Sequence, residues 1–314
     1  MTVTYPSIVL AAPPYLPPPL VLDPGWGGLV MTWTGFDGHE WSLTSHADGS
    51  GLVLMTGVQG LGAPTFTHFR DTYASMHGSR WRDYRANARE VFWPLYLFHD
   101  ESTAEWRQLN RAFTRTMSPR KTGVWKVTSP GQPSRSLRLR YEKGLEGAFS
   151  LDPTKFGWAK YGIYLTADQP YWEGTPIART WTTADPIPFF DAAGSPPLHI
   201  SGPPRVDTAT LTNPGDVESW PVWTFTGPMS GAEVGVNGQT VSWEMELTEG
   251  DTLVIDTRPT AQTAMLNGVD VTASLLTFGF AEIPEGANVP LTVLLDGIGG
   301  TARVELTPLY EWGF

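Results

Sequence analysis

The chain has 314 residues, a formal net charge of −11, 28 prolines, 33 glycines, 14 tryptophans and no cysteine. This length predicts about two domains with substantial cores. The absence of cysteine excludes a disulfide scaffold, a thiolate nucleophile and cysteine-ligated zinc. No apolar run reaches the roughly 18 residues that cross a bilayer, and the N-terminal stretch has no basic residue, so we expect neither membrane insertion nor a signal peptide.

The charge is distributed in three blocks along the chain. Residues 1–69 carry −4, residues 70–160 carry +8 and residues 161–314 carry −15. A basic middle between acidic ends is typical of a protein with different neighbours on different surfaces, or of a subunit whose basic face meets another subunit. Chance patterning of solvated faces is the alternative.

The N-terminal third is predicted to be a Pro-rich arm followed by strands. Residues 11–25 hold most of the early prolines and should be extended. Two short strands follow within 29–45 around an Asp-Gly turn, which is a good hairpin signal. Residues 51–64 give a further strand and a glycine-rich loop, and the apolar run 89–98 gives another strand.

One helix is predicted, from Thr103 to Met117. Ser102 and Glu105 fit a capping box at its start, and Pro119 follows its end. Apolar residues recur on one face at helical spacing, as expected for packing against a core: Trp106, Leu109, Phe113 and Met117. The opposite face carries Arg107, Arg111 and Arg115, which form either a solvated stripe or an intersubunit contact.

The rest of the chain is predicted to be strands. Three follow the helix, at 125–129, 135–141 and 158–168. Residues 173–202 are rich in Pro and Gly and mark a boundary, so we expect domains over 1–172 and 173–314. Beyond about 203, short strands alternate with Gly-bearing turns. Two of these are Asn-Gly turns, Asn237-Gly238 and Asn267-Gly268, and the pattern is typical of a β-sandwich.

The sequence contains no motif for catalysis or metal binding. The six histidines form no HExxH, and GxSxG, a Walker lysine and an EF-hand loop are absent. Most acidic residues after 203 lie in turns, where carboxylates usually face solvent. We therefore expect no catalytic residue, no metal site, no cofactor and no enzymatic activity.

Three tryptophans of the C-terminal half could have either of two roles. Trp220, Trp223 and Trp243 could form a platform on which a sugar stacks. At alternating strand positions, however, tryptophans are more often part of the core. The sequence leaves both interpretations open.

An ordered set of motifs resembles the distal tail proteins of siphoviruses, of the type found in phages of actinobacteria. In the C-terminal half these are TLTNPGDVESWPVWTFTGP (210–228), LTEGDTLVIDT (247–257) and IPEGAN (283–288). In the N-terminal half they are GVQGLGAPTFTHF, GSRWRDYRANAREVFWPLYLF, the single helix, RSLRLRYEKGLEG and ADQPYW. The resemblance covers nearly the whole chain, although the Pro-rich arm is not part of it.

The resemblance implies a mainly β protein with an N-terminal belt-type β-sandwich carrying one helix and a C-terminal galectin-like β-sandwich. It implies a structural virion protein at the tail tip, assembled in the bacterial cytoplasm as a homohexameric ring. The ring would join the tail-tube protein to hub or fibre proteins, with DNA only passing through its lumen. Ring contacts are expected at Arg80, Arg82, Arg85 and Arg89, or at Arg107, Arg111 and Arg115. The alternative is a carbohydrate-binding tail protein that contacts the host cell surface.

Overall fold

A computed structural model describes residues 25–46, 49–75, 77–147, 149, 151–183, 209–297 and 299–314. Residue contacts divide the chain into two compact units. Unit 1 comprises Met1–Gln59, Glu90–Trp125 and Leu139–Thr166, and unit 2 comprises Gly60–Arg89, Lys126–Arg138 and Ala167–Phe314. The Pro-rich arm predicted over 11–25 lies outside the described residues except for Gly25.

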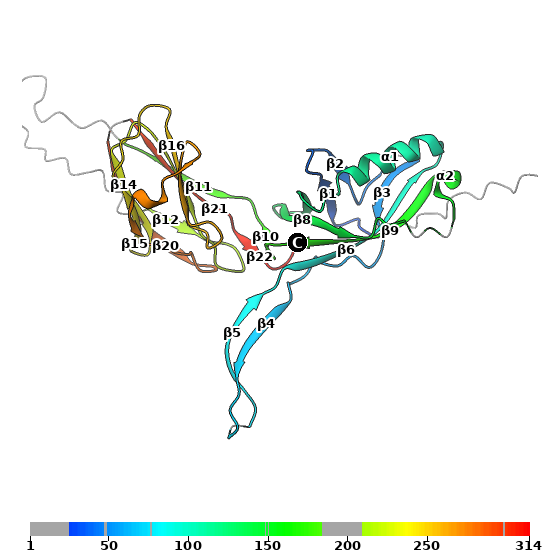
Figure 1. The fold of residues 1–314 in the computed structure, drawn as a ribbon, viewed down its shortest axis with the longest axis horizontal. Coiled ribbons are helices and arrows are strands. Elements are labelled where there is room, and N and C mark those ends of the chain that lie inside the picture. Colours follow the sequence, from blue (N-terminus) through cyan, green and yellow to red (C-terminus); the bar gives the residue numbers. More distant parts are fainter. Residues whose placement is uncertain are drawn as a thin grey trace, which may run out of the picture. The chain divides into compact units, whose positions relative to one another are not determined.

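The first sheet confirms the strands predicted in the N-terminal half (Figure 1). Its order is β2-β1-β7-β8-β9-β6-β3, and β10 pairs with both β8 and β22. The bounds are β1 Val30–Thr34, β2 Glu40–Ser42, β3 Ser50–Leu54, β6 Arg89–His99, β7 Thr122–Thr128, β8 Arg135–Lys143, β9 Trp158–Ala167, β10 Trp172–Glu173 and β22 Leu309–Tyr310.

Tryptophans form the centre of the core in unit 1. Trp93 lies edge-to-face between Trp33 and Trp125, with ring centroids 5.4 and 5.3 Å away. All three side chains are fully buried. Edge-to-face pairs add about 0.5–1.5 kcal/mol each to the burial of the rings themselves.

The predicted helix is confirmed as α1, Thr103–Arg115. The Ser102 hydroxyl accepts a hydrogen bond from the Glu105 backbone N–H, so the cap forms as expected. Trp106 and Phe113 are buried on the predicted apolar face. A short helix, α2 (Pro153–Phe156), was not predicted; it follows the Asp152 N-cap and ends at Gly157, whose φ is 71°.

The C-terminal part of unit 2 is a sandwich of two antiparallel sheets, which confirms the mainly β fold class. One sheet has the order β11-β21-β13-β16-β17-β18 and the other β12-β20-β14-β15-β19. The bounds are β11 Ile177–Thr182, β12 Thr210–Thr212, β13 Val222–Thr226, β14 Gly231–Val236, β15 Gln239–Trp243, β16 Thr252–Asp256, β17 Thr263–Leu266, β18 Val269–Asp270, β19 Leu275–Phe278, β20 Asn288–Asp296 and β21 Thr301–Leu306.

Both Asn-Gly turns form hairpins as predicted. Asn237 and Gly238 have φ values of 54° and 79°, and Asn267 and Gly268 have 48° and 82°. Positive φ at both central residues is what a two-residue type I′ turn requires, and Asn and Gly tolerate it best. These turns join β14 to β15 and β17 to β18.

Two elements differ from the sequence-based expectation. Strand β11 lies in the segment that was expected to be a connection, and it pairs with β21 along its whole length. A hairpin of β4 (Phe66–Asp71) and β5 (Arg80–Ala86) was not predicted either. The domain boundary after residue 172 stays a prediction. No helix among the residues that the structure describes is long and apolar enough to cross a membrane.

Candidate assembly surfaces

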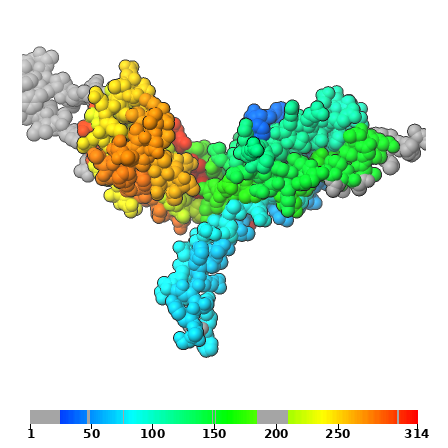
Figure 2. Space-filling view, viewed as in Figure 1, coloured from blue at the N-terminus to red at the C-terminus, as the bar shows by residue number. Residues whose placement is uncertain are grey.

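The hairpin of β4 and β5 is a sheet of only two strands, and we call residues 66–86 the arm. Figure 2 shows its surface in cyan. Most of its side chains are exposed, and Trp81 and Tyr73 reach 54% and 58%. A single two-stranded hairpin is at best marginally stable in water. The arm therefore has little stability of its own.

Strand register gives the arm two different faces. Tyr84 lies opposite His68 and contacts Phe66 edge-to-face with ring centroids 5.4 Å apart. A register shift after Phe69 then brings Trp81 opposite Arg70, and the Trp81 indole N–H donates to His68 Nδ1 at 3.3 Å. Phe66, Tyr84 and Trp81 therefore lie on one face of the arm, together with Arg70.

The other face of the arm carries most of its charged residues, together with the exposed ring of Phe69. Thr67 lies opposite Arg85, Phe69 opposite Asp83, and Asp71 opposite Arg80. Arg82, at the register shift, forms an ion pair with Asp71. Of the arginines predicted as ring contacts, Arg80, Arg82 and Arg85 thus lie exposed on the arm, which is consistent with a contact role but does not test it.

Arg89 is not available for a ring contact, which corrects that expectation. Its side chain is buried, with 2% exposed, and its guanidinium donates to backbone carbonyl oxygens of Gly60, Gly62, Pro170 and Glu311. Burial lowers the pKa of Arg89 to about 10, so it stays protonated at neutral pH. The four carbonyl oxygens accept hydrogen bonds from the guanidinium and so compensate for the loss of its hydration on burial.

The C-terminal residues complete the base of the arm. Gly313 N–H donates to the Leu61 carbonyl at 2.8 Å. Arg135 donates to the carbonyl oxygens of Trp312 and Phe314 at 2.7 and 3.1 Å, and its guanidinium lies 3.9 Å from the centre of the Tyr310 ring. Together with Arg89, these contacts join both ends of the arm to residues that are far away in sequence.

Helix α1 provides the second surface that the sequence predicted. Arg107, Arg111 and Arg115 are all exposed, and among the described residues none of them forms an ion pair. Like charges at i,i+4 destabilise a helix slightly. Arg107 and Arg111 border a groove of about 370 Å³ whose other walls include Phe149 and Pro153.

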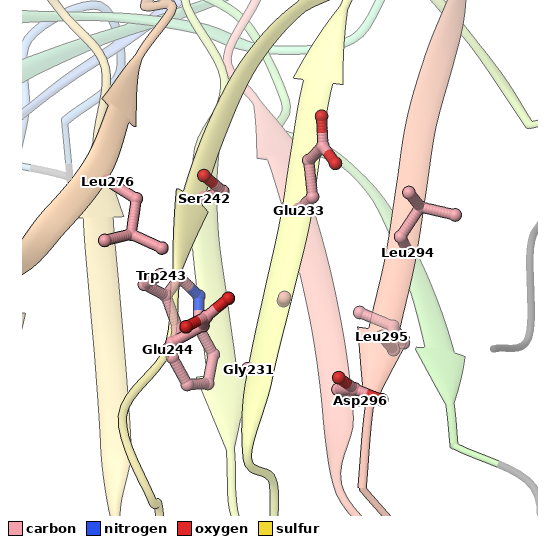
Figure 3. Close-up of a pocket in the computed structure, with 10 residues that line it drawn as sticks. Gly231, Glu233, Ser242, Trp243, Glu244, Leu276, Leu294, Leu295 and Asp296 are labelled. Atoms are coloured by element: carbon pink, nitrogen blue, oxygen red, sulfur yellow. The ribbon is translucent and has the colours of Figure 1, made fainter.

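For two of the three tryptophans that could form a platform or belong to the core, the structure supports the core. Trp223 and Trp243 are each 1% exposed and belong to the sandwich core, where Trp243 contacts Phe225 with centroids 5.4 Å apart. Figure 3 shows a hollow on the outer face of the sheet at this point, lined by Glu233, Glu244 and the side chains around them. Of the three tryptophans considered as a platform, Trp220 alone is partly exposed.

Sequence reasoning missed the arm and the role of Arg89. Both strands of the arm mix aromatic, polar and charged residues without a period of two, so neither face shows the apolar pattern that marks a core strand. Arg89 binds carbonyl groups up to 222 positions away, which no local pattern encodes. Within the described part of the chain, no group of three potential metal ligands is present.

Comparison with solved structures shows the fold of the distal tail (Dit) proteins of phages. The chain is similar to SPP1 Dit (gp 19.1), a paradigm of the hub adsorption apparatus in phages that infect Gram-positive bacteria. The TM-score is 0.58 and the identity 15%, over 90% of this chain and 98% of SPP1 Dit. It is also similar to a chain of the phage P2 baseplate, with a TM-score of 0.52 and 13% identity over 89% and 98% of the two chains. No family model and no curated protein matches the sequence. The resemblance inferred from the motifs is confirmed for the fold.

Proposed function

We propose that the protein is a structural component of the distal tail of a non-contractile-tailed phage. In this proposal six copies form a ring at the tail tip through the belt-type N-terminal domain, and the galectin-like domain faces outward. The ring joins the tail-tube protein to hub or fibre proteins, leaves a lumen for DNA, and is assembled in the host bacterial cytoplasm. It performs no catalysis.

The observation that carries the proposal is the arm in a chain with the Dit fold. The aromatic rings on an exposed two-stranded hairpin leave apolar surface in contact with water unless another surface covers them. A ring provides such a surface through a heterologous contact, in which the arm of one subunit meets a different surface of the next. Because every subunit both gives and receives an arm, closure of the ring leaves none uncovered.

The distribution of charge supports the same arrangement. Residues 70–86 of the arm and all of α1 lie in the block of +8. The exposed arginines of α1 form no ion pair with an acidic residue among the described residues. A neighbouring subunit or another tail protein with an acidic face would provide one. Arg80, Arg82, Arg85 and the α1 stripe therefore remain proposed contacts, and Arg89 does not.

Mass measurement by light scattering and electron microscopy tests the ring. Six copies of a 34.5 kDa chain give a particle of about 207 kDa. The substitution W81A, combined with Y84A, should shift the equilibrium toward monomers because it removes two exposed rings from one face of the arm. F278A removes an equally exposed ring from the sandwich and should leave assembly unchanged. Monomers at every concentration of the unaltered protein, or rings that tolerate the arm variant, would contradict the proposal.

A further inference from the structure

A cavity in unit 2 lies around the partly exposed Trp220. Its volume is about 550 Å³, within the range of about 300–1,000 Å³ that is common for small-ligand sites. Strands β8 and β10 contribute Arg138 and Glu173, the segment before β13 contributes Glu218 and Trp220, and the segment after β16 contributes Arg258. We call this cavity the Trp220 cleft.

We propose that the Trp220 cleft is a binding site for a neutral saccharide, with Trp220 as the wall on which the sugar ring stacks. The two other tryptophans considered for this role are core residues, whereas Trp220 lies just before β13 and keeps part of its ring accessible inside the cleft. The C–H face of a pyranose is apolar and packs on an aromatic ring, while its hydroxyl groups remain free for polar partners.

The polar groups of the cleft are planar and partly fixed in position. The Arg258 guanidinium is held by the Asp256 carboxylate, with Nε at 2.9 and 3.1 Å from its two oxygens. Arg138 Nε lies 3.6 Å from Glu173 Oε2, beyond hydrogen-bond distance, so both groups keep bonding capacity for a ligand. Guanidinium and carboxylate groups can each bind two neighbouring hydroxyls at once, which suits a sugar diol.

The charges of the cleft favour a neutral ligand over an anionic one. Glu173, Glu218 and Glu305 line it, against Arg138 and Arg258. Arg258 is paired with Asp256 and Glu305 with Arg303, so Glu173 and Glu218 still outnumber Arg138. Burial and nearby negative charge, including that of Glu218, raise the pKa of Tyr171 to about 12. The phenol of Tyr171, which also lines the cleft, is therefore a neutral hydroxyl at physiological pH and can donate or accept a hydrogen bond.

The hollow of Figure 3 lacks this combination. It is lined by Glu233, Glu244 and Asp296 together with aliphatic groups, and the ring of Trp243 is buried beneath it. Trp243 also lines the hollow but is only 1% exposed, so the hollow offers carboxylates and the Ser242 hydroxyl with little aromatic surface. Of these two cavities, the Trp220 cleft is the one in which a partly exposed ring and planar polar groups meet.

A saccharide panel followed by calorimetric titration tests the proposal on the full-length protein. Suitable probes are maltotriose, the trimer of N-acetylglucosamine, lactose and a rhamnose disaccharide, with sialyllactose as the anionic probe. We expect saturable binding of at least one neutral probe and a loss of about tenfold or more in affinity for W220A, which corresponds to about 1.4 kcal/mol. W220F should recover part of the loss because it restores an aromatic face.

F278A is the matched control, since it removes an exposed ring from the same sandwich outside the cleft. It should bind the probe as the unaltered protein does. E218Q should also weaken binding without disturbing the fold, which near-ultraviolet circular dichroism checks for each variant. Binding of the anionic probe alone, no binding of any neutral probe below about 10 mM, or equal binding by W220A would overturn the proposal. The titration does not depend on the oligomeric state, so its failure is distinct from failure of the ring.

Discussion

The arm and the C-terminal sandwich are both built from antiparallel hairpins, yet they obtain their stability differently. In the sandwich, alternate side chains of β13 and β15 point into a shared core, so that Trp223, Phe225 and Trp243 are buried. In the arm, neither face of β4 or β5 has a core beneath it, and rings such as Trp81 remain exposed. The same local structure therefore has a core of its own in one region, whereas in the other it has none and is held by contacts at its base.

Removal of a core ring from the sandwich should produce the largest loss of stability. We expect W243A to lower the free energy of unfolding by about 3–5 kcal/mol, because it loses burial and leaves a cavity. The matched change in the arm, W81A, should alter it by less than about 0.5 kcal/mol. Urea denaturation followed by circular dichroism measures both. Equal losses would show that the arm folds as part of the core.

The base of the arm can be tested at Arg89. R89M leaves four backbone carbonyl oxygens without their donor, and we expect a loss of about 3 kcal/mol. R85M, on the charged face of the arm, should change little. Hydrogen exchange at β4 and β5 provides a second measurement, because release of the base should expose these amides first. Unchanged exchange in R89M would contradict the role of Arg89 at the base.

The elements predicted correctly from the sequence are those with local signals. The cap at Ser102 and the helical spacing of Trp106 and Phe113 are close together in the sequence, and they predict α1. Asn237-Gly238 predicts its hairpin because both residues tolerate a positive φ. Such signals depend on neighbours along the chain. They can therefore be recognised in the sequence without knowledge of the tertiary contacts.

The features that were missed depend on partners distant in sequence. Strand β11 forms because it pairs with β21, beginning with Ile177 opposite Leu306. Most residues of β11 are exposed, so its sequence has no apolar pattern of its own. The sequence suggests that Arg89 is a basic surface residue, because the carbonyl groups that bind it come from three segments distant in sequence. Trp220 could not be separated from Trp223 by pattern, since only the packed structure shows which ring reaches a cavity.

Two glycines allow a matched comparison of the hairpin turns. Gly238 in the sandwich and Gly78 in the arm have φ values of +79° and +85°, and an added Cβ would meet no atom within 4 Å at either position. Alanine therefore brings only the backbone strain of positive φ, about 1 kcal/mol. We expect G238A to lower the global free energy of unfolding by about that amount. G78A should leave it unchanged, because the arm opens separately; an equal loss would contradict this.

The smallest expected effect is a pH dependence within the sandwich. Hydrogen bonds from the Thr248 side chain and then from Asn267 hold the pKa of Asp251 below its ordinary value of 3.8, joining the β15–β16 turn to the β17–β18 turn. Because the folded-state pKa is the lower one, this contribution is present above about pH 4 and is lost as the pH falls through the folded-state value. We expect D251N to lower Tm slightly at pH 7, and the difference from the unaltered protein to shrink toward pH 3. D71N, which breaks the exposed ion pair with Arg82 in the arm, should leave Tm unchanged because the arm opens before the sandwich unfolds. A difference between D251N and the unaltered protein that grows on acidification would mean that the turn contacts do not favour the charged carboxylate.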